Sequence, residues 1–145
     1  MSAQREILVT LPGGRRVAAS LGAHQVLTDQ PRDNGGEDTA PSPFDLFLAS
    51  LGTCAGIFVQ GFCARRDIPT DDIRIKETAS FDAQGTLRTV CLDIQVPASF
   101  PEQYREALAR VVDQCSVKRA IAAQPTFLVR TTAPNQGAAK VAAAK

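Results

Sequence analysis

The fold is decided by the stretch SPFDLFLASLGTCAGIFVQGFCARR, which covers residues 42–66. Ser42 followed by Pro43 is typical of a helix start, because a proline at the first helical position loses no hydrogen bond. Asp45 follows Ser42 at the spacing of a capping box and suits the positive end of a helix. We therefore expect a helix over residues 43–66, about 36 Å long at ~1.5 Å per residue.

Apolar side chains surround this helix. They are Phe44, Leu46, Phe47, Leu48, Leu51, Cys54, Ile57, Phe58, Val59 and Cys63. A helix that is apolar all round must be buried on every side, so we expect it at the centre of the fold. The alternative is a membrane span, because residues 46–64 carry no charge over a length that crosses a bilayer. Polar Ser50 and Gln60 favour the buried helix, in which Gly52 and Gly56 would let another element approach closely.

The flanking sequence predicts a single α+β domain over residues 1–132. Strands are expected at residues 5–11, 15–21, 23–29, 72–82, 86–96 and 126–132, and a loop at residues 30–41. Ser99 and Glu102 have capping-box spacing and predict a second helix, which Cys115 closes. A short helical turn follows at residues 117–122. Residues 133–145 are rich in Ala, Lys and Gly without a pattern, and we expect them to be disordered.

Composition narrows the possible functions. The 145 residues carry a net charge of +1, with no Trp and one Tyr, which argues against a nucleic-acid surface. The N-terminus lacks the pattern of a signal peptide, so we expect a cytoplasmic protein whose four cysteines are mostly reduced. The single histidine makes a zinc site a poor candidate, and we expect no bound cofactor.

Cys54 and Cys115 are the candidates for thiol chemistry, provided that the fold brings them together. A peroxide-reducing thiol must be a thiolate, which requires a cation or hydrogen-bond donors beside it. It also needs a second thiol within about 6 Å, Cα to Cα, to form a disulfide. No cation lies near Cys54 in the sequence, and Arg15 or Arg16 on a strand end is the best-placed source. The alternative is that both cysteines are small buried core residues.

The other cysteines and the histidine have simpler interpretations. Cys63 lies nine residues after Cys54, so the two side chains point in different directions and are too far apart to bond. Cys91 lies on the less apolar face of a strand, and we expect both Cys63 and Cys91 to be structural. His24 is interpreted as an ordinary strand residue.

Several blocks of sequence occur in a specific order. They are Gly22-Ala23-His24, Asp29-Gln30-Pro31, GGEDTAPSPFDL at residues 35–46, Leu51-Gly52-Thr53-Cys54 and Cys115-Ser116-Val117-Lys118-Arg119. In this order and spacing, the sequence resembles the OsmC/Ohr superfamily over about residues 8–132. The resemblance implies an α+β fold in which two chains intertwine as a homodimer. Each long central helix would be buried between antiparallel sheets.

The resemblance also implies reduction of organic hydroperoxides at the dimer interface. Cys54 falls on the peroxidatic position and Cys115 on the resolving position, and Arg15 matches the family arginine better than Arg16 does. Better-studied members have Pro-Glu at the start of the central helix, and this glutamate pairs with the arginine. Here Phe44 follows the proline and Asp45 comes one position later, which rotates the side chain by about 100°. Asp45 is therefore the candidate replacement for the glutamate, with an altered reach.

Together these arguments predict a cytoplasmic, homodimeric thiol peroxidase that takes part in the oxidative stress response. Its substrates would be organic hydroperoxides more than hydrogen peroxide, and an external dithiol would reduce the Cys54–Cys115 disulfide. No nucleic acid or membrane partner is expected. The alternative is a noncatalytic protein that binds small apolar molecules in the same cleft.

Overall fold

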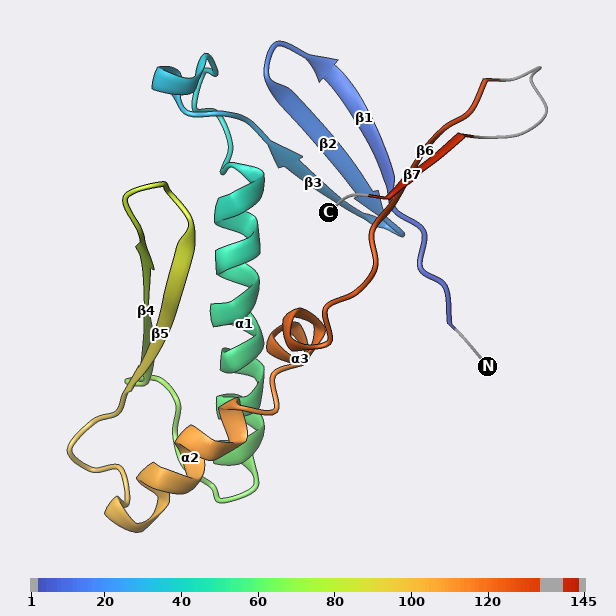
Figure 1. The fold of residues 1–145 in the computed structure, drawn as a ribbon. Helices are drawn as coiled ribbons and strands as arrows, with labels where there is room; N and C mark the ends of the chain where they lie inside the picture. Colours follow the sequence, from blue (N-terminus) through green and yellow to red (C-terminus); the bar gives the residue numbers. More distant parts are fainter. Residues whose placement is uncertain (1–2, 134–139, 144–145) are drawn as a thin grey trace.

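The computed structural model describes residues 3–133 and 140–143. Its centre is the long helix α1 (Pro43–Ala64). The antiparallel sheet of β1 (Leu8–Gly13), β2 (Arg16–Leu21) and β3 (His24–Thr28) lies on one side of α1, and the hairpin of β4 (Arg74–Phe81) and β5 (Leu87–Gln95) lies on the other (Figure 1). Antiparallel sheets and a long central helix are therefore confirmed.

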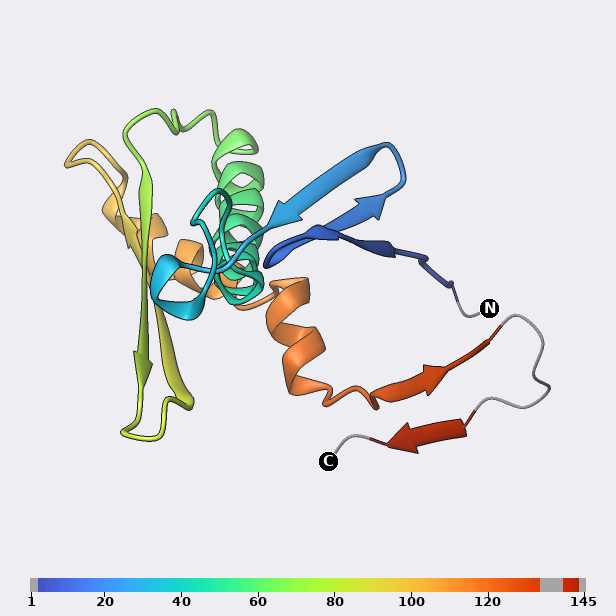
Figure 2. The same ribbon diagram turned by 90° about the horizontal axis from the view of Figure 1, so that it is seen from above.

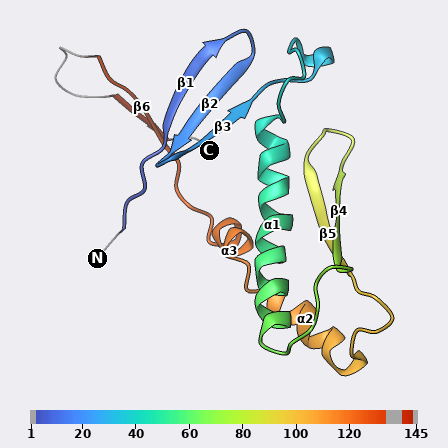
Figure 3. The same ribbon diagram turned by 180° about the vertical axis from the view of Figure 1, so that it is seen from behind.

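The second half of the chain returns along α1. A short 3-10 helix (Glu102–Tyr104) leads into α2 (Arg105–Val112), and α3 (Ser116–Ala122) follows after a turn. Figure 3 shows α2 beside the end of α1 and α3 beside its middle, and both helices contact α1. The capping box expected at Ser99 is not formed, because the 3-10 helix begins after Pro101 without a side-chain cap.

The last strands form a separate hairpin. Strand β6 (Leu128–Thr131) pairs antiparallel with β7 (Lys140–Ala143). Strand β7 falls in the stretch that we expected to be disordered, and this part of the expectation is corrected by the pairing. Residues 134–139 and 144–145, also in that stretch, lie outside the described residues.

The capping box predicted at the start of α1 is formed. The Ser42 hydroxyl accepts a hydrogen bond from the Asp45 N–H at 3.2 Å, and the Asp45 carboxylate accepts one from the Ser42 N–H at 3.1 Å. Pro43 occupies the first helical position. The helix ends at Ala64, two residues before the expected end, and Asp67 then turns the chain with a φ of 53°.

The glycines of α1 allow a close approach by a strand, as expected. A Cβ at Gly52 would lie 2.6 Å from the Glu77 Oε2, and one at Gly56 would lie 4.0 Å from Ile75. Both neighbours belong to β4. The other carboxylate oxygen of Glu77 is buried without a hydrogen-bond partner in the described part of the chain. Small residues at positions 52 and 56 thus allow β4 to pack directly on the helix.

The hydrophobic core lies between α1, α2 and the β4–β5 hairpin. It contains Ala55, Val59, Phe62, Cys63, Phe100, Leu108 and Val112. The buried positions of α1 recur at steps of three and four and therefore form one face of the helix. This face is covered by the chain's own elements.

The opposite face of α1 is not covered by the described residues of its own chain, so burial on every side stays a prediction that needs a second copy. Ala49, Thr53, Ile57, Gln60 and Ala64 are all exposed. The Ile57 side chain is 67% exposed. By length and composition α1 could cross a membrane, and only 33% of its most apolar window is buried in the chain.

The sheets also leave apolar surface open. Leu11 on β1 is 81% exposed, and Phe127, beside β6, is 67% exposed. Figure 2 shows the β1–β2–β3 sheet and the β6–β7 hairpin extending away from α1. The chain has an accessible surface of 11502 Å², whereas a compact monomer of 15.4 kDa exposes about 7,200 Å². The chain therefore exposes more surface than a compact monomer would. The ten undescribed residues can account for at most about 1,600 Å² of this extra surface, at ~160 Å² per unfolded residue.

Candidate active site

Helices α1 and α3 bring the two predicted thiols together. Cys54 is half-buried near the middle of α1, and Cys115 is completely buried in the turn before α3. The Cys115 thiol is the neighbour with the largest effect on the pKa of Cys54, and the Ser116 hydroxyl lies 3.6 Å from the Cys54 sulfur. Both cysteines are free, not disulfide-bonded. The two thiols are therefore neighbours within one chain, and their disulfide stays a prediction.

Hydrogen-bond donors around Cys54 stabilise its thiolate. The Cys115 thiol has the largest effect, followed by the Val117 N–H, and the hydroxyl and N–H of Ser116 add to them. Partial burial opposes them, but the net result is that the pKa of Cys54 falls from its ordinary value to about 7. Half of the Cys54 population is then ionised near neutral pH, which is the reactive form of a cysteine.

The local sequence positions these donors at the start of α3. Cys115 is the N-cap residue of α3, so Ser116 and Val117 belong to the first turn, where backbone N–H groups have no partner within the helix. The Cys115 N–H donates to the Val112 carbonyl and closes the turn from α2. Lys118 and Asp113 form an ion pair of 2.6 Å across the same turn. These contacts hold the turn that carries Cys115.

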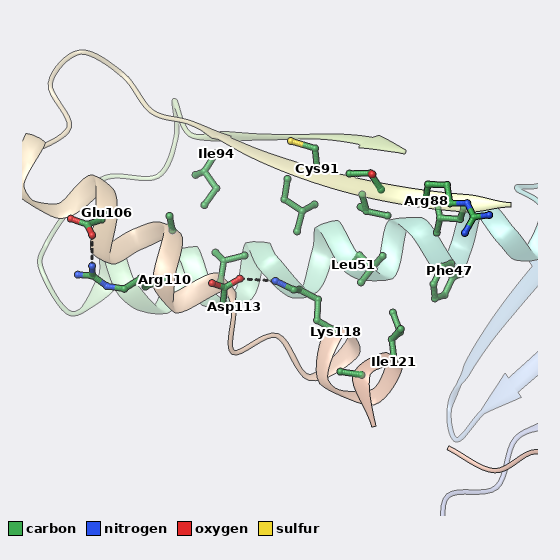
Figure 4. A pocket seen from close by; sticks show the side chains of 17 residues that line it. Phe47, Leu51, Arg88, Cys91, Ile94, Glu106, Arg110, Asp113, Lys118 and Ile121 are labelled. Atoms are coloured by element: carbon green, nitrogen blue, oxygen red, sulfur yellow. Dashed lines mark hydrogen bonds and ion pairs between the residues drawn. The ribbon is translucent and has the colours of Figure 1, made fainter. Parts of the chain in front are cut away.

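The other two cysteines are placed differently. Cys63 is buried in the core, and this burial raises the pKa of its thiol. Cys91 is exposed on β5, and Figure 4 shows its sulfur pointing away from α1. Neither contributes to the pKa shift of Cys54.

The predicted arginine is not brought to Cys54 within one chain. Arg15 lies in the exposed β1–β2 turn, and its Nε would be 3.5 Å from a Cβ at Gly35, so its guanidinium packs against the loop after β3. Arg16 begins β2 and is also exposed. The groups that lower the pKa of Cys54 include neither arginine nor any other cation. A role of Arg15 at Cys54 therefore stays a prediction.

Asp45 serves the start of α1. Its carboxylate accepts hydrogen bonds from the N–H and the hydroxyl of Ser42, the latter at 2.6 Å. Among the described residues it forms no ion pair with an arginine. The contacts of Asp45 are those of a helix cap, and the catalytic role suggested for it stays a prediction.

A buried carboxylate that the sequence analysis did not single out organises the loop beside Arg15. Asp29 is only 1% exposed and accepts hydrogen bonds from the N–H groups of Gln30, Glu37 and Thr39. The Thr39 hydroxyl, at 2.7 Å, has the largest effect, and together the donors lower the pKa of Asp29 to about 2. The Asp29-Gln30-Pro31 motif was visible in the sequence, but nothing in it indicated which groups would gather around the carboxylate.

A cleft of about 770 Å³ lies between α1, β5, α2 and α3 (Figure 4). Its apolar wall includes Phe47 and Leu51 on α1, Ile94 on β5 and Ile121 on α3. The lining cations Arg88, Arg110 and Lys118 are paired with Asp82, Glu106 and Asp113, respectively. Cys54 and Cys115 do not line this cleft, although Leu51 is less than one helical turn from Cys54. Among the described residues no group of three His, Cys, Asp or Glu side chains could hold a metal ion.

Comparison with known proteins identifies the family. The model of the family described as OsmC-like protein matches residues 35–130. The chain belongs to the OsmC-like family. The matched segment contains α1 with Cys54 and the α2–α3 turn with Cys115, but not Arg15. No curated protein sequence matches the chain.

Solved structures share the fold of this OsmC-like chain. A protein of Psychrobacter arcticus 273-4, assigned to the osmotic stress induced and detoxification response, has a TM-score of 0.70 and 21% identity, covering 83% of this chain and 90% of its own. An OsmC-like protein from Mycoplasma pneumoniae has a TM-score of 0.65 and 17% identity, covering 86% and 91%. An organic hydroperoxide resistance protein from Elizabethkingia anophelis has a TM-score of 0.56 and 20% identity, covering 86% and 93%. At these identities the likeness shows the fold alone.

Proposed function

We propose that this protein is a cytoplasmic thiol peroxidase that reduces organic hydroperoxides through Cys54 as part of the response to oxidative stress. The observation that carries the proposal is the position of Cys54 beside Cys115 and Ser116, the neighbours that lower its pKa to about 7. One sulfur is thereby prepared as the nucleophile and the other is placed to resolve the product. The name of the Elizabethkingia neighbour, an organic hydroperoxide resistance protein, supports the same chemistry.

The proposed cycle has three steps. The Cys54 thiolate attacks the terminal oxygen of the hydroperoxide, the O–O bond breaks, and the alkoxide takes a proton from solvent and leaves as the alcohol. Cys54 is now a sulfenic acid. The Cys115 sulfur attacks Cys54, water leaves, and a disulfide forms. An external dithiol then reduces this disulfide to two thiols and is itself oxidised to a disulfide.

The preference for organic over inorganic peroxide rests on the apolar surroundings of α1. Leu51, less than one helical turn from Cys54, and Phe47 line the neighbouring cleft, whose cations are paired. An apolar tail that extends from Cys54 past Leu51 would be buried there without leaving a charge unpaired. Burial of such a tail stabilises the complex by about 0.8 kcal/mol for each methylene. Hydrogen peroxide has no tail and gains nothing from these residues.

We propose a homodimer as the active form. The uncovered face of α1, with exposed Ile57 at its centre, and the exposed apolar side chains of β1 and β6 are surfaces that a second copy would cover. The chain exposes about 4,300 Å² more surface than a compact monomer of its mass. At least ~2,700 Å² of this extra surface belongs to the described residues, and an area of this size is typical of an obligate interface. Arg15 remains the candidate for a cation that reaches Cys54 only in the dimer.

The test is peroxide consumption by the purified protein with dithiothreitol as reductant, comparing cumene hydroperoxide with hydrogen peroxide. We expect faster turnover with cumene hydroperoxide, loss of turnover in Cys54→Ser, and wild-type rates in Cys63→Ser and Cys91→Ser. Mass spectrometry after one equivalent of peroxide should find a Cys54–Cys115 disulfide. Four free thiols after this treatment, or no consumption of either peroxide, would refute the proposal.

The arginine is tested separately by the pH dependence of Cys54 alkylation. Arg15→Ala should raise the pKa of Cys54 if the dimer places this arginine at the thiolate, and Arg16→Ala is the matched control. The reverse pattern would assign the role to Arg16. Unchanged profiles in both variants would show that the donors from the α2–α3 turn act without an arginine.

The second candidate function is noncatalytic binding of small apolar molecules. It is favoured by one observation, that Cys54 and Cys115 do not line the cleft of about 770 Å³. Stoichiometric binding of a fluorescent apolar probe, unchanged in Cys54→Ser and weakened in Leu51→Gln, together with no peroxide consumption, would support this function over the peroxidase.

A further inference from the structure

The residue after Cys115 touches the reacting sulfur. Ser116 is the first residue of α3, its side chain is exposed, and its Oγ lies 3.6 Å from the Cys54 Sγ. Among the described residues, this contact is the only hydrogen bond of the Ser116 hydroxyl. The hydroxyl is therefore not occupied by a local backbone partner, unlike the Thr53 hydroxyl beside Cys54, which bonds the carbonyls of Ala49 and Ser50.

The direction of this hydrogen bond follows from the state of the sulfur. A thiolate has no proton, so it can only accept, and the Ser116 hydroxyl must donate. Hydrogen bonds to an ionised partner are shorter and stronger than those between neutral groups. The contact therefore strengthens as Cys54 ionises, and it favours the charged form over the neutral thiol.

We infer that Ser116 is a further catalytic residue of this protein, whose hydroxyl donates a hydrogen bond to the Cys54 thiolate that attacks the peroxide. The inference rests on the proposed function. Ser116 has a different role from Cys115. Cys115 loses its S–H group when it forms the disulfide, whereas the Ser116 hydroxyl is unchanged throughout the cycle.

Few other groups affect the pKa of Cys54. Cys115 and the Val117 N–H also donate to the sulfur, and Lys118 on α3 is paired with Asp113. No charged side chain is among the groups that shift the pKa of Cys54. Loss of the Ser116 hydroxyl would thus remove one of a small set of donors, and no cation among the described residues lowers the pKa of Cys54 in its place.

An isosteric pair of variants tests the inference. Ser116→Thr keeps the hydroxyl, and Ser116→Val replaces it with a methyl group of similar size at an exposed position. Thr53→Ala is the matched control, since it removes a hydroxyl next to Cys54 that bonds only its own helix. Alkylation by iodoacetamide is followed from pH 5 to 10 by mass spectrometry of the peptide that contains Cys54. This measurement does not depend on peroxidase activity.

The expected results separate the variants at neutral pH. With a wild-type pKa of about 7, any rise in the pKa of Cys54 lowers the thiolate fraction at pH 7, and the alkylation rate at pH 7 falls in proportion. We expect this loss in Ser116→Val, near wild-type rates in Ser116→Thr and Thr53→Ala, and a parallel fall in peroxide turnover at pH 7 that is recovered at pH 9.

Two outcomes would contradict the reasoning at different points. Identical alkylation profiles in Ser116→Val and Ser116→Thr would overturn the role of the hydroxyl. If the profiles separate as expected but the wild type consumes no peroxide, the hydrogen bond to the thiolate stands and the proposed peroxidase function is overturned.

Discussion

Replacement of Ile57 tests whether the uncovered face of α1 is covered by a second copy. Ile57 is 67% exposed in the single chain, although burial of an isoleucine side chain stabilises a protein by about 1.5–3 kcal/mol. Covering its exposed two thirds would contribute about 1–2 kcal/mol per copy, and a twofold dimer contains two copies. Ile57→Gln should therefore weaken dimerisation by about 2–4 kcal/mol, or roughly 30- to 800-fold in Kd.

The same substitution should leave the folded monomer nearly unaffected. Position 57 contacts solvent in the single chain, and glutamine forms helices as readily as most residues. Ala83→Gln, in the exposed turn between β4 and β5, is the control for an added amide elsewhere. Any change specific to Ile57→Gln then reports on the interface and not on the stability of α1.

Light scattering and sedimentation over nanomolar to micromolar concentrations provide the measurement. The wild type should have twice the chain mass of 15.4 kDa throughout the micromolar range, and Ile57→Gln should dissociate at higher concentrations than Ala83→Gln. A wild type that is a stable monomer at micromolar concentration refutes the dimer. Equal dissociation constants for the two variants would place the interface elsewhere, and a requirement for detergent would favour the membrane span instead.

Two further predictions concern Asp45, in the first turn of α1, and Asp29, in the loop before it. Asp45→Asn should lower the free energy of unfolding by about 0.5–1 kcal/mol, because the capping box is weakened, and should leave turnover unchanged. A large loss of turnover at constant stability would instead give Asp45 the catalytic role. The pKa of Asp29 is about 2 in the folded chain, below its ordinary value, so its stabilisation is complete above about pH 4 and is lost as the pH falls towards 2. The melting temperatures of wild type and Asp29→Asn should therefore converge over this range, and a constant difference from pH 7 to pH 2 would contradict the assignment.

The features predicted correctly from the sequence are those that depend on neighbouring residues. Ser42, Pro43 and Asp45 specify the start of α1 among themselves, because a capping box needs only one turn of chain. Gly52 and Gly56 indicated a close approach, and the strand β4 makes it. The capping box expected at Ser99 shows the limit of such patterns. The same spacing occurs there, but Pro101 is the residue before the 3-10 helix and no side chain caps it.

The candidate site was predicted only in part, since it joins segments that are far apart in the sequence. Cys54 and Cys115 were identified by type and by the resemblance, but Ser116 was not, because its contact depends on how α3 packs against α1. Asp29 was missed for a related reason, as its donors lie up to ten residues away in an irregular loop. All-round burial of α1 was expected from composition, which does not distinguish between cover from the same chain and cover from a second one.

The composition of the site determines how substitutions of Cys115 must be interpreted. Among the groups that lower the pKa of Cys54, the Cys115 thiol has the largest effect. The same sulfur is the proposed resolving group. Cys115→Ala removes both functions, so a loss of turnover in that variant would not show which one mattered.

Cys115→Ser keeps a hydroxyl that can donate to the thiolate but cannot form a disulfide. First-turnover attack on peroxide at pH 7 should therefore be faster in Cys115→Ser than in Cys115→Ala, while both accumulate Cys54 sulfenic acid. Equal first-turnover rates would mean that the hydrogen bond from position 115 does not govern the reactivity of Cys54.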